Sequence, residues 1–290
     1  NGPWSGKSGK FVTMRNISTR LYREVKTNIS LRVEPTDSPD ALSVAGRGEL
    51  QLAILLENMR REGFEICVSK PRVVIKRIDG HQCEPIEEVT IDVNDDSVES
   101  IIQELASRKG TILSMDRDEV GNNRLIFEVP TRGMIGFRTI FLTLTSGMGM
   151  VSRQFKEFAP WKGDIATRTR GSLIANQTGN ATAYAIAPLQ ERSTLFVSPG
   201  DEVYEGQIVG ENSRSEDMVV NITKAKKQTN MRSSTEDATV LITPPRLFNL
   251  EQALSFIGDD ELLEVTPDAL RFRKKILSSL DRRIEDRKSK

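Results

Sequence analysis

Apolar positions in the segment 1–80 follow two different periods. Three- and four-residue steps from Met14 to Val25 predict a helix over 14–26, and the same spacing from Leu52 to Met59 predicts a second helix, which Gly63 ends. Apolar and polar residues alternate between and after these helices. The predicted order is therefore helix, strand, strand, helix, strand, which is a split βαβ unit without its first strand. We expect that the chain is a fragment cut within or just after that strand.

The segment 81–160 repeats this arrangement with all of its parts. Strands are predicted around Val89–Val93, over 111–117, over 124–129 and over 151–158, and the turn Gly121-Asn122 joins the middle two. Helices are predicted from Asp96 to Gly110 and over 133–144, each with one apolar face. This is a complete β-α-β-β-α-β order, so a ferredoxin-like domain is expected.

From about Trp161 the pattern changes to short apolar runs separated by Gly, Asn, Thr and Ser. Helices are expected to start at Asn249 and at Thr266, where Pro267 suits a first turn. The predicted fold class is α+β, with two tandem ferredoxin-like (split βαβ) domains followed by a β-rich C-terminal domain with terminal helices. The predicted domains are residues 1–80, 81–160 and 161–290. The short strands are expected at 172–175, 181–187, 195–197, 219–222 and 240–242.

Composition restricts the class of protein. Lys plus Arg and Asp plus Glu both number 41 in 290 residues, so the net charge is zero and only local clusters can indicate an anionic partner. No apolar run reaches the ~18–20 residues of a membrane span, and no signal peptide opens the chain. Cys67 and Cys83 form no metal or redox motif. A cytoplasmic protein without membrane attachment is expected.

Residues suited to catalysis are scarce. His81 is the only histidine, and it stands in a polar turn. The glycine-rich segment 2–8 has three residues between its glycines where a phosphate-binding loop has four, and no apolar strand precedes it. The guanine-specificity sequence Asn-Lys-x-Asp is absent. We therefore expect no catalytic residue, no metal, no cofactor and no enzymatic activity in this chain.

Arg47 lies between Gly46 and Gly48 at the start of a predicted helix, where the helix dipole disfavours a cation. An external anion such as RNA phosphate would explain it. A surface pair with Glu49 or another acid is the alternative, and both interpretations remain open.

The clearest basic segment runs from Asn221 to Thr235 and contains no acidic residue. Such a loop can follow phosphates, although a solvated loop without a ligand is the alternative. A second basic group lies on the helix expected after Thr266, where a solvated face is the simpler interpretation. The candidate RNA-binding residues are Arg47, Lys224, Lys226, Lys227, Arg232, Arg271, Arg273, Lys274 and Lys275.

Longer motifs carry a family resemblance. Residues 46–52 and the run Glu-Asn-Met-Arg-Arg-Glu-Gly-Phe at 57–64 resemble domain III of elongation-factor-G-like GTPases, in the variant typical of BipA/TypA. Residues 84–158 resemble domain V of that group. Residues 163–284, with Asn-Ile-Thr-Lys-Ala-Lys at 221–226, resemble the C-terminal domain peculiar to BipA/TypA.

The resemblance implies a part of a translational GTPase that binds the ribosome. Its expected partners are large-subunit rRNA, the A-site tRNA and ribosomal proteins, with the chain itself monomeric. The intact parent would use GTP and Mg, and would serve large-subunit assembly and growth under stress. A protein-interaction or regulatory scaffold is the alternative that zero net charge and the β-rich domain suggest, and an independent enzyme is a third hypothesis.

Overall fold

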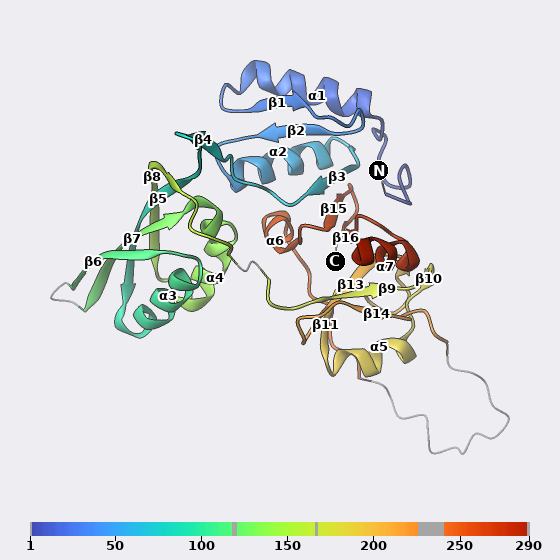
Figure 1. The fold of residues 1–290 in the computed structure, drawn as a ribbon. Coiled ribbons are helices and arrows are strands. Elements are labelled where there is room, and N and C mark those ends of the chain that lie inside the picture. The colour runs from blue at the N-terminus through green and yellow to red at the C-terminus, as the bar shows by residue number, and fades with distance from the viewer. Residues whose placement is uncertain (1, 118–120, 166–167, 226–240, 289–290) are drawn as a thin grey trace. The chain divides into compact units, whose positions relative to one another are not determined.

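The computed structural model describes residues 2–117, 121–165, 168–225 and 241–288. The chain divides into two compact units, one made of Asn1–Lys70 and Arg168–Lys290 and the other of Pro71–Thr167. Figure 1 shows helices and sheets in both. The predicted α+β fold class is confirmed.

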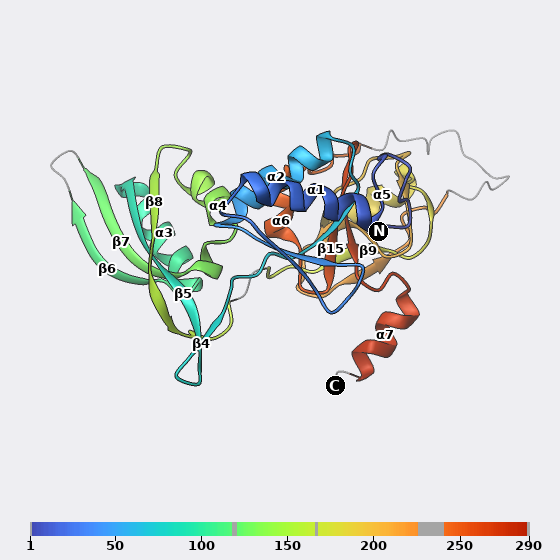
Figure 2. The same cartoon turned by 90° about the horizontal axis from the view of Figure 1, so that it is seen from above.

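The unit Pro71–Thr167 contains the complete ferredoxin-like arrangement. Its long first strand β5 pairs with β8 on one side and β7 on the other, and β6 pairs with the far side of β7. If these four strands are numbered 1 to 4 along the chain, their spatial order in the sheet is 4-1-3-2, and all neighbours are antiparallel, as a ferredoxin-like domain requires. Figure 2 shows the same strands from above. A short strand β4 precedes β5 through the turn Asp79-Gly80, where both residues have positive φ, 50° and 81°, as a tight hairpin requires. The elements are β4 (Lys76–Ile78), β5 (His81–Asn94), α3 (Asp95–Ser107), β6 (Thr111–Arg117), β7 (Asn122–Pro130), the 3₁₀ turn η1 (Thr131–Met134), α4 (Phe137–Leu144) and β8 (Met150–Pro160).

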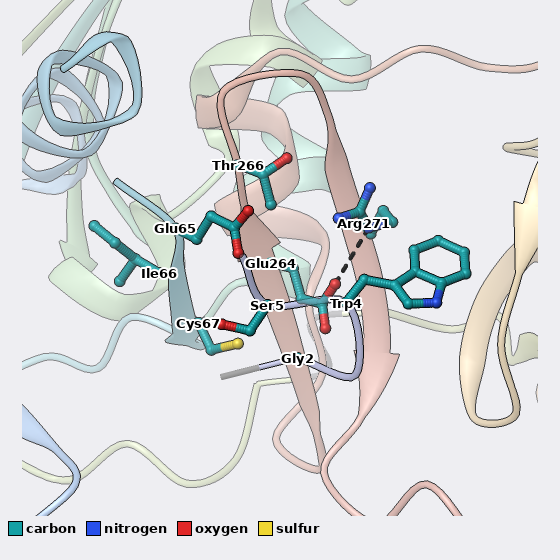
Figure 3. A pocket seen from close by; sticks show the side chains of 9 residues that line it. All are labelled: Gly2, Trp4, Ser5, Glu65, Ile66, Cys67, Glu264, Thr266 and Arg271. Carbon is teal, nitrogen blue, oxygen red and sulfur yellow. Dashed lines mark hydrogen bonds and ion pairs between the residues drawn. The ribbon is translucent and has the colours of Figure 1, made fainter. Parts of the chain in front are cut away.

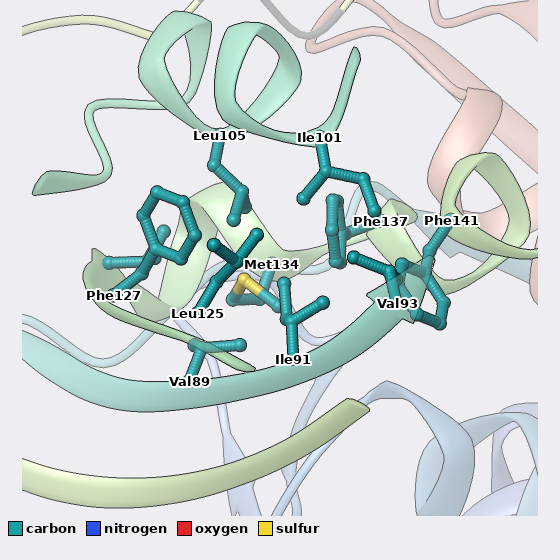
Figure 4. Packing of buried hydrophobic residues seen from close by; sticks show 11 residues of the cluster. Val89, Ile91, Val93, Ile101, Leu105, Leu125, Phe127, Met134, Phe137 and Phe141 are labelled. Carbon is teal, nitrogen blue, oxygen red and sulfur yellow. The ribbon is translucent and has the colours of Figure 1, made fainter. Parts of the chain in front are cut away.

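The core of this unit follows from the period-two pattern of its strands. Val89, Ile91 and Val93 alternate along β5 and all face the two helices, while Phe127 does the same on β7 (Figure 4). Helix α3 adds apolar residues from its inner face. Because one face of the sheet buries these side chains, a slip of one residue in register would expose all of them.

The N-terminal part of the other unit has the predicted order of elements. Helices α1 and α2 pack with a two-stranded hairpin, β1–β2, around a core that includes Leu21, Leu55 and Met59. Thr13 caps α1 by accepting a hydrogen bond from the Asn16 amide. These elements are α1 (Met14–Thr27), β1 (Arg32–Pro35), β2 (Leu42–Ala45), α2 (Glu49–Arg61) and β3 (Ile66–Ser69).

Strand β3 belongs to a sheet built mostly from residues beyond 170. It pairs antiparallel with β15, with Val68 opposite Leu263, and closes the strand order β14-β9-β13-β16-β15-β3. Apolar side chains of α2 and α6 meet in the same core, which includes Ala53 and Leu254. Residues 1–70 and the C-terminal region thus share one sheet and one core. The remaining elements are β9 (Ser172–Ala175), β10 (Gly179–Asn180), α5 (Ala183–Gln190), β11 (Ser193–Leu195), β12 (Glu202–Val203), β13 (Gln207–Asn212), β14 (Met218–Val220), α6 (Leu250–Phe256), β15 (Glu261–Val265), β16 (Leu270–Lys274) and α7 (Ser279–Lys288).

The helix predicted from Thr266 is wrong in its first half. Thr266 and Ala269 exchange backbone and side-chain hydrogen bonds at 2.9–3.1 Å, which closes a tight turn between β15 and β16. The helical part, α7, begins only at Ser279. The helix expected after Asn249 is confirmed as α6, with a reciprocal capping box between Asn249 and Gln252.

The strand predicted over 181–187 is also wrong, because this run begins helix α5. The Thr182 hydroxyl accepts a hydrogen bond from the Ala185 amide and so caps the helix. Ala185, Ile186 and Leu189 are buried, so the helix has an apolar inner face at steps of three and four residues. No strand starts at residues 241–242, and residue 240 lies outside the described part of the chain.

Candidate nucleic-acid interface

Arg47 is exposed at the start of α2, as predicted. The Gln51 side-chain oxygen accepts a hydrogen bond from the Arg47 amide at 2.7 Å, and the Gln51 amide group in turn donates to Ser30 at 2.6 Å. The turn is therefore fixed through its backbone, while Arg47 as a residue is exposed. Both interpretations of Arg47, an external anion or a pair with Glu49 or another acid, therefore stay open.

The first residues of the basic segment are attached to the start of α5. The Thr182 hydroxyl donates to the backbone oxygen of Lys224 at 2.6 Å, and the Thr182 amide donates to that of Ile222 at 3.0 Å. Ile222 is buried in the core, whereas Lys224 is exposed. The main chain at Lys224 is thus anchored while its side chain remains free to bind an anion.

The chain that follows the basic segment is attached to the last residue of α5. The Gln190 side-chain amide donates to the Leu241 oxygen at 2.7 Å, and its side-chain oxygen accepts from the Thr243 amide at 3.0 Å. One short helix therefore holds the chain at the start of the basic segment and again at residues 241–243, which follow the acids Glu236 and Asp237. We refer to the contacts of Thr182 and Gln190 as the α5 clamp. Lys226, Lys227 and Arg232 lie outside the described residues.

Exposed side chains gather beside the clamp. Lys224 places its Nζ 6.0 Å from the ring centroid of Tyr184, whose residue is 46% exposed. Gln177, Asn221 and Thr223 are joined by side-chain hydrogen bonds in the same region; we call these three the polar cluster. Sequence reasoning missed Tyr184 and Gln177. The run around Tyr184 resembled a strand, and Thr182 as a helix cap was the signal that could have corrected it.

Arg271 and Arg273 lie on strand β16 and not on a basic helix face. Their guanidinium Nε atoms lie 3.2 Å from the two carboxylate oxygens of Glu264, a residue that is 3% exposed. Arg271 also lies over the ring of Trp4, 5.2 Å from its centroid. Both cations are therefore engaged by groups of the protein itself.

Lys274 is 2% exposed, and its ammonium contacts three carboxylates. Its Nζ lies 2.6 Å from both Asp217 and Asp260 and 3.2 Å from Glu261. Burial alone would raise the pKa of Glu261, but hydrogen bonds and charge from Arg168, with the charge of Lys274, lower that pKa to about 2. This buried charge cluster is structural. Lys275 is exposed, with its Nζ donating to the backbone oxygen of Asp259 at 2.6 Å.

The glycine-rich segment near the N-terminus surrounds a carboxylate of the protein. The amides of Gly6, Ser8 and Gly9 donate to Glu65 at 2.7, 2.8 and 2.6 Å. Burial opposes the charge of Glu65, but these three bonds lower its pKa below the ordinary value. Glu65 thus occupies the position that an anionic ligand would take in a phosphate-binding loop.

A small pocket lies beside this segment, between Trp4, Glu65 and β15–β16. Figure 3 shows the carboxylate of Glu264 near Trp4, with its ion pair to the Arg271 guanidinium dashed. The cavity volume is about 10 Å³, which is space for a single water molecule and not for a nucleotide.

Metal-ligand clusters and membrane-spanning helices are both absent from the described residues. No group of three or more His, Cys, Asp or Glu side chains in that part of the chain could hold a metal ion. Likewise, the helices described there are all too short or too polar to cross a membrane.

Two family models match adjacent parts of the chain. The model of the elongation factor G C-terminus matches residues 81–169, which contain the ferredoxin-like sheet. The model of the TypA/BipA C-terminal domain matches residues 170–279, which contain the α5 clamp and Lys274 with its three carboxylate partners.

Similar proteins of greater length carry the name large ribosomal subunit assembly factor BipA. The Bacillus subtilis protein is 48% identical over 291 residues, which cover 100% of this chain and 48% of that protein. The Escherichia coli K12 protein is 49% identical over 99% of this chain and 48% of its own length. The Haemophilus influenzae protein is 49% identical over 98% of this chain and 46% of its own length. The chain spans about half the length of the curated relatives it matches.

Proposed function

The chain belongs to the TypA/BipA family, as its motifs indicated, and we propose that it is the ribosome- and RNA-binding part of a translational GTPase. Its partners in this proposal are large-subunit rRNA and the A-site tRNA region. The name of the relatives, large ribosomal subunit assembly factor, supports a role of the parent protein in assembly of that subunit. The setting is the cytoplasm, and the chain acts as a monomer.

The α5 clamp is the observation that carries this proposal. A basic run gains affinity for RNA when the chain is held on both sides of it, because less conformational entropy is lost on binding. Thr182 holds the chain at Lys224, and Gln190 holds it again at Leu241, beyond the basic run. Lys224 is exposed at the first of these two points. Arg47 adds a second exposed cation at a backbone-fixed turn.

In this proposal the chain contributes binding and not turnover. GTP and Mg would be used by other parts of the parent protein. The purified chain is therefore expected to hydrolyse no GTP above the buffer rate. Specific turnover by this chain would show that it is an enzyme in its own right.

Co-sedimentation with large ribosomal subunits at a series of salt concentrations tests the proposal. Lys224, Lys226 and Lys227 changed together to Ala should reduce the slope of log affinity against log salt by about 2–3, since each neutralised phosphate contributes ~0.7–0.9. The matched control changes Lys10, Lys26 and Arg283, three exposed cations elsewhere in the same unit, and should leave most of the affinity.

Two outcomes would contradict the proposal. One is binding that ignores both salt and the triple change. The other is a complex that persists after RNase treatment at high salt, which would favour the protein-interaction scaffold instead.

A further inference from the structure

Tyr184 is presented to solvent by a helix that is fixed on its opposite side. It is the second residue of α5, and its neighbours Ala185 and Ile186 are buried at 6% and 0% exposure. An aromatic ring that is 46% exposed on such a rigid support offers a flat apolar face at little entropic cost. The Lys224 ammonium, 6.0 Å from the ring centroid, places a positive charge beside that face.

The polar cluster leaves an amide donor and an amide acceptor unused. The Asn221 side-chain oxygen accepts from the Thr223 amide at 3.2 Å, from the Thr223 hydroxyl at 3.1 Å and from Gln177 at 3.4 Å. This assignment leaves the Asn221 NH₂ group and the Gln177 side-chain oxygen without a partner in the described part of the chain. A base edge, which carries donors and acceptors side by side, could pair with both groups.

The cluster is fixed close to Tyr184 by the chain itself. Thr223 immediately precedes Lys224, whose backbone oxygen accepts from Thr182, two residues before Tyr184. Gly179 lies against Thr223: a Cβ added at Gly179 would come within 3.2 Å of the threonine side chain. The glycine thus allows the two segments of chain to approach closely.

We propose that Tyr184 is a stacking site for an unpaired base of single-stranded RNA, with Lys224 binding the adjoining phosphate and Asn221 and Gln177 contacting the base edge. This inference rests on the proposed RNA-binding function and names the form of RNA that the site takes. Within an RNA, bases in the interior of a duplex have both faces covered by their neighbours, so a base that stacks on this ring must be unpaired. The cation and free amide groups around the ring favour a nucleotide over the apolar side chains of a protein anchor.

Fluorescence anisotropy with labelled octanucleotides tests the site. The full chain is titrated with an oligoriboadenylate and with an abasic strand of the same length and charge. The wild type should bind the base-bearing strand at least ~10-fold more tightly, and Tyr184→Ala should remove most of that preference. Tyr184→Phe should stay within about twofold of the wild type, because stacking needs the ring and not the hydroxyl. Lys224→Ala should lower the affinity for both strands alike, and the slope of log affinity against log salt should become smaller by about 1.

Tyr22 supplies a matched control, since it is 44% exposed in α1 of the same unit. Tyr22→Ala should change neither affinity, and thermal unfolding should show that both alanine variants fold. Any of three results overturns the inference. The wild type binds the two strands equally, it binds neither strand, or its preference for the base-bearing strand survives Tyr184→Ala. Ribosome co-sedimentation is read separately: salt-dependent binding there with no base preference here would reject the stacking site and keep the proposed function.

Discussion

Single carboxylates determine the conformation of two segments of this protein. Glu65 accepts three backbone hydrogen bonds from the glycine-rich segment, and Glu261 lies between the cations of Arg168 and Lys274. In both cases a negative charge is buried with enough donors to hold it ionised. The sequence could indicate that segment 2–8 lacks the spacing of a phosphate-binding loop. It could not indicate Glu65 as the bound anion, because the two are far apart along the chain.

Replacement of Glu65 by Gln should destabilise the protein by about 1–3 kcal/mol. The glutamine oxygen can keep part of the hydrogen bonding, but its NH₂ group then faces backbone donors and the charge is lost. Urea unfolding measures the difference, and amide exchange should become faster at Gly6, Ser8 and Gly9. Glu34→Gln, at an exposed position of β1, is the control and should stay within about 0.5 kcal/mol. Unchanged exchange at the three amides would contradict the role of Glu65.

The pH dependence of stability should reveal Glu261. Its pKa in the folded protein is about 2, below the ordinary 4.5, so it contributes stability above pH 4.5 that is lost as the pH falls toward 2. The shift corresponds to about 3 kcal/mol. Glu261→Gln should therefore be less stable than the wild type at pH 7, and the gap should narrow as urea unfolding is repeated down to about pH 3. A gap that stays constant over that range would show that Glu261 is not the titrating group.

At the scale of elements, the apolar positions of a short segment can fit both the two-residue period of a strand and the three- to four-residue period of a helix. The stretch from Leu270 to Lys275 carries four cations with apolar residues among them, a composition that suits either a basic helix or a buried strand. The acids that neutralise Arg271, Arg273 and Lys274 come from β15, the turn before it and Asp217. Without these distant partners the sequence predicted a solvated helix. By contrast, α6 was predictable because its capping box is local.

Comparison of Lys274→Met with Lys275→Met should show which cation at the end of β16 contributes to the stability of the fold. Lys274→Met leaves Asp217, Asp260 and Glu261 without their shared ammonium and should cost about 3–5 kcal/mol in urea unfolding. Lys275→Met changes an exposed neighbour and should cost less than about 1 kcal/mol. If the two variants were equally stable, the charge cluster would not contribute to the fold.

At the scale of the whole molecule, the sequence predicted the second ferredoxin-like unit well because every main strand of its sheet lies between His81 and Pro160. The fold of residues 1–70 was harder to predict. Its order of helices and strands was correct, but the partner of β3 is β15, which begins only at Glu261, and no local pattern specifies such a distant pairing.

The two compact units should therefore differ when each is produced alone. Residues 71–167 contain a closed hydrophobic core and all four main strands, so this fragment should unfold cooperatively in urea. Residues 1–70 alone leave the edge of β3 unpaired and should not fold, but should gain structure when 168–290 is added. Circular dichroism and amide exchange measure both. Stable folding of 1–70 alone would mean that β15 is dispensable.

The pairing of β3 with β15 also determines when the sheet can be completed during synthesis of the chain. Val68 leaves the translating ribosome long before its partner Leu263. At ~5–20 residues per second, the nascent β3 waits roughly 10–40 s with an open edge. The ferredoxin-like unit, encoded in between, can fold during that delay. Completion of the other sheet is then a late event for the segment 1–70, whose β3 edge stays unpaired until β15 has been made.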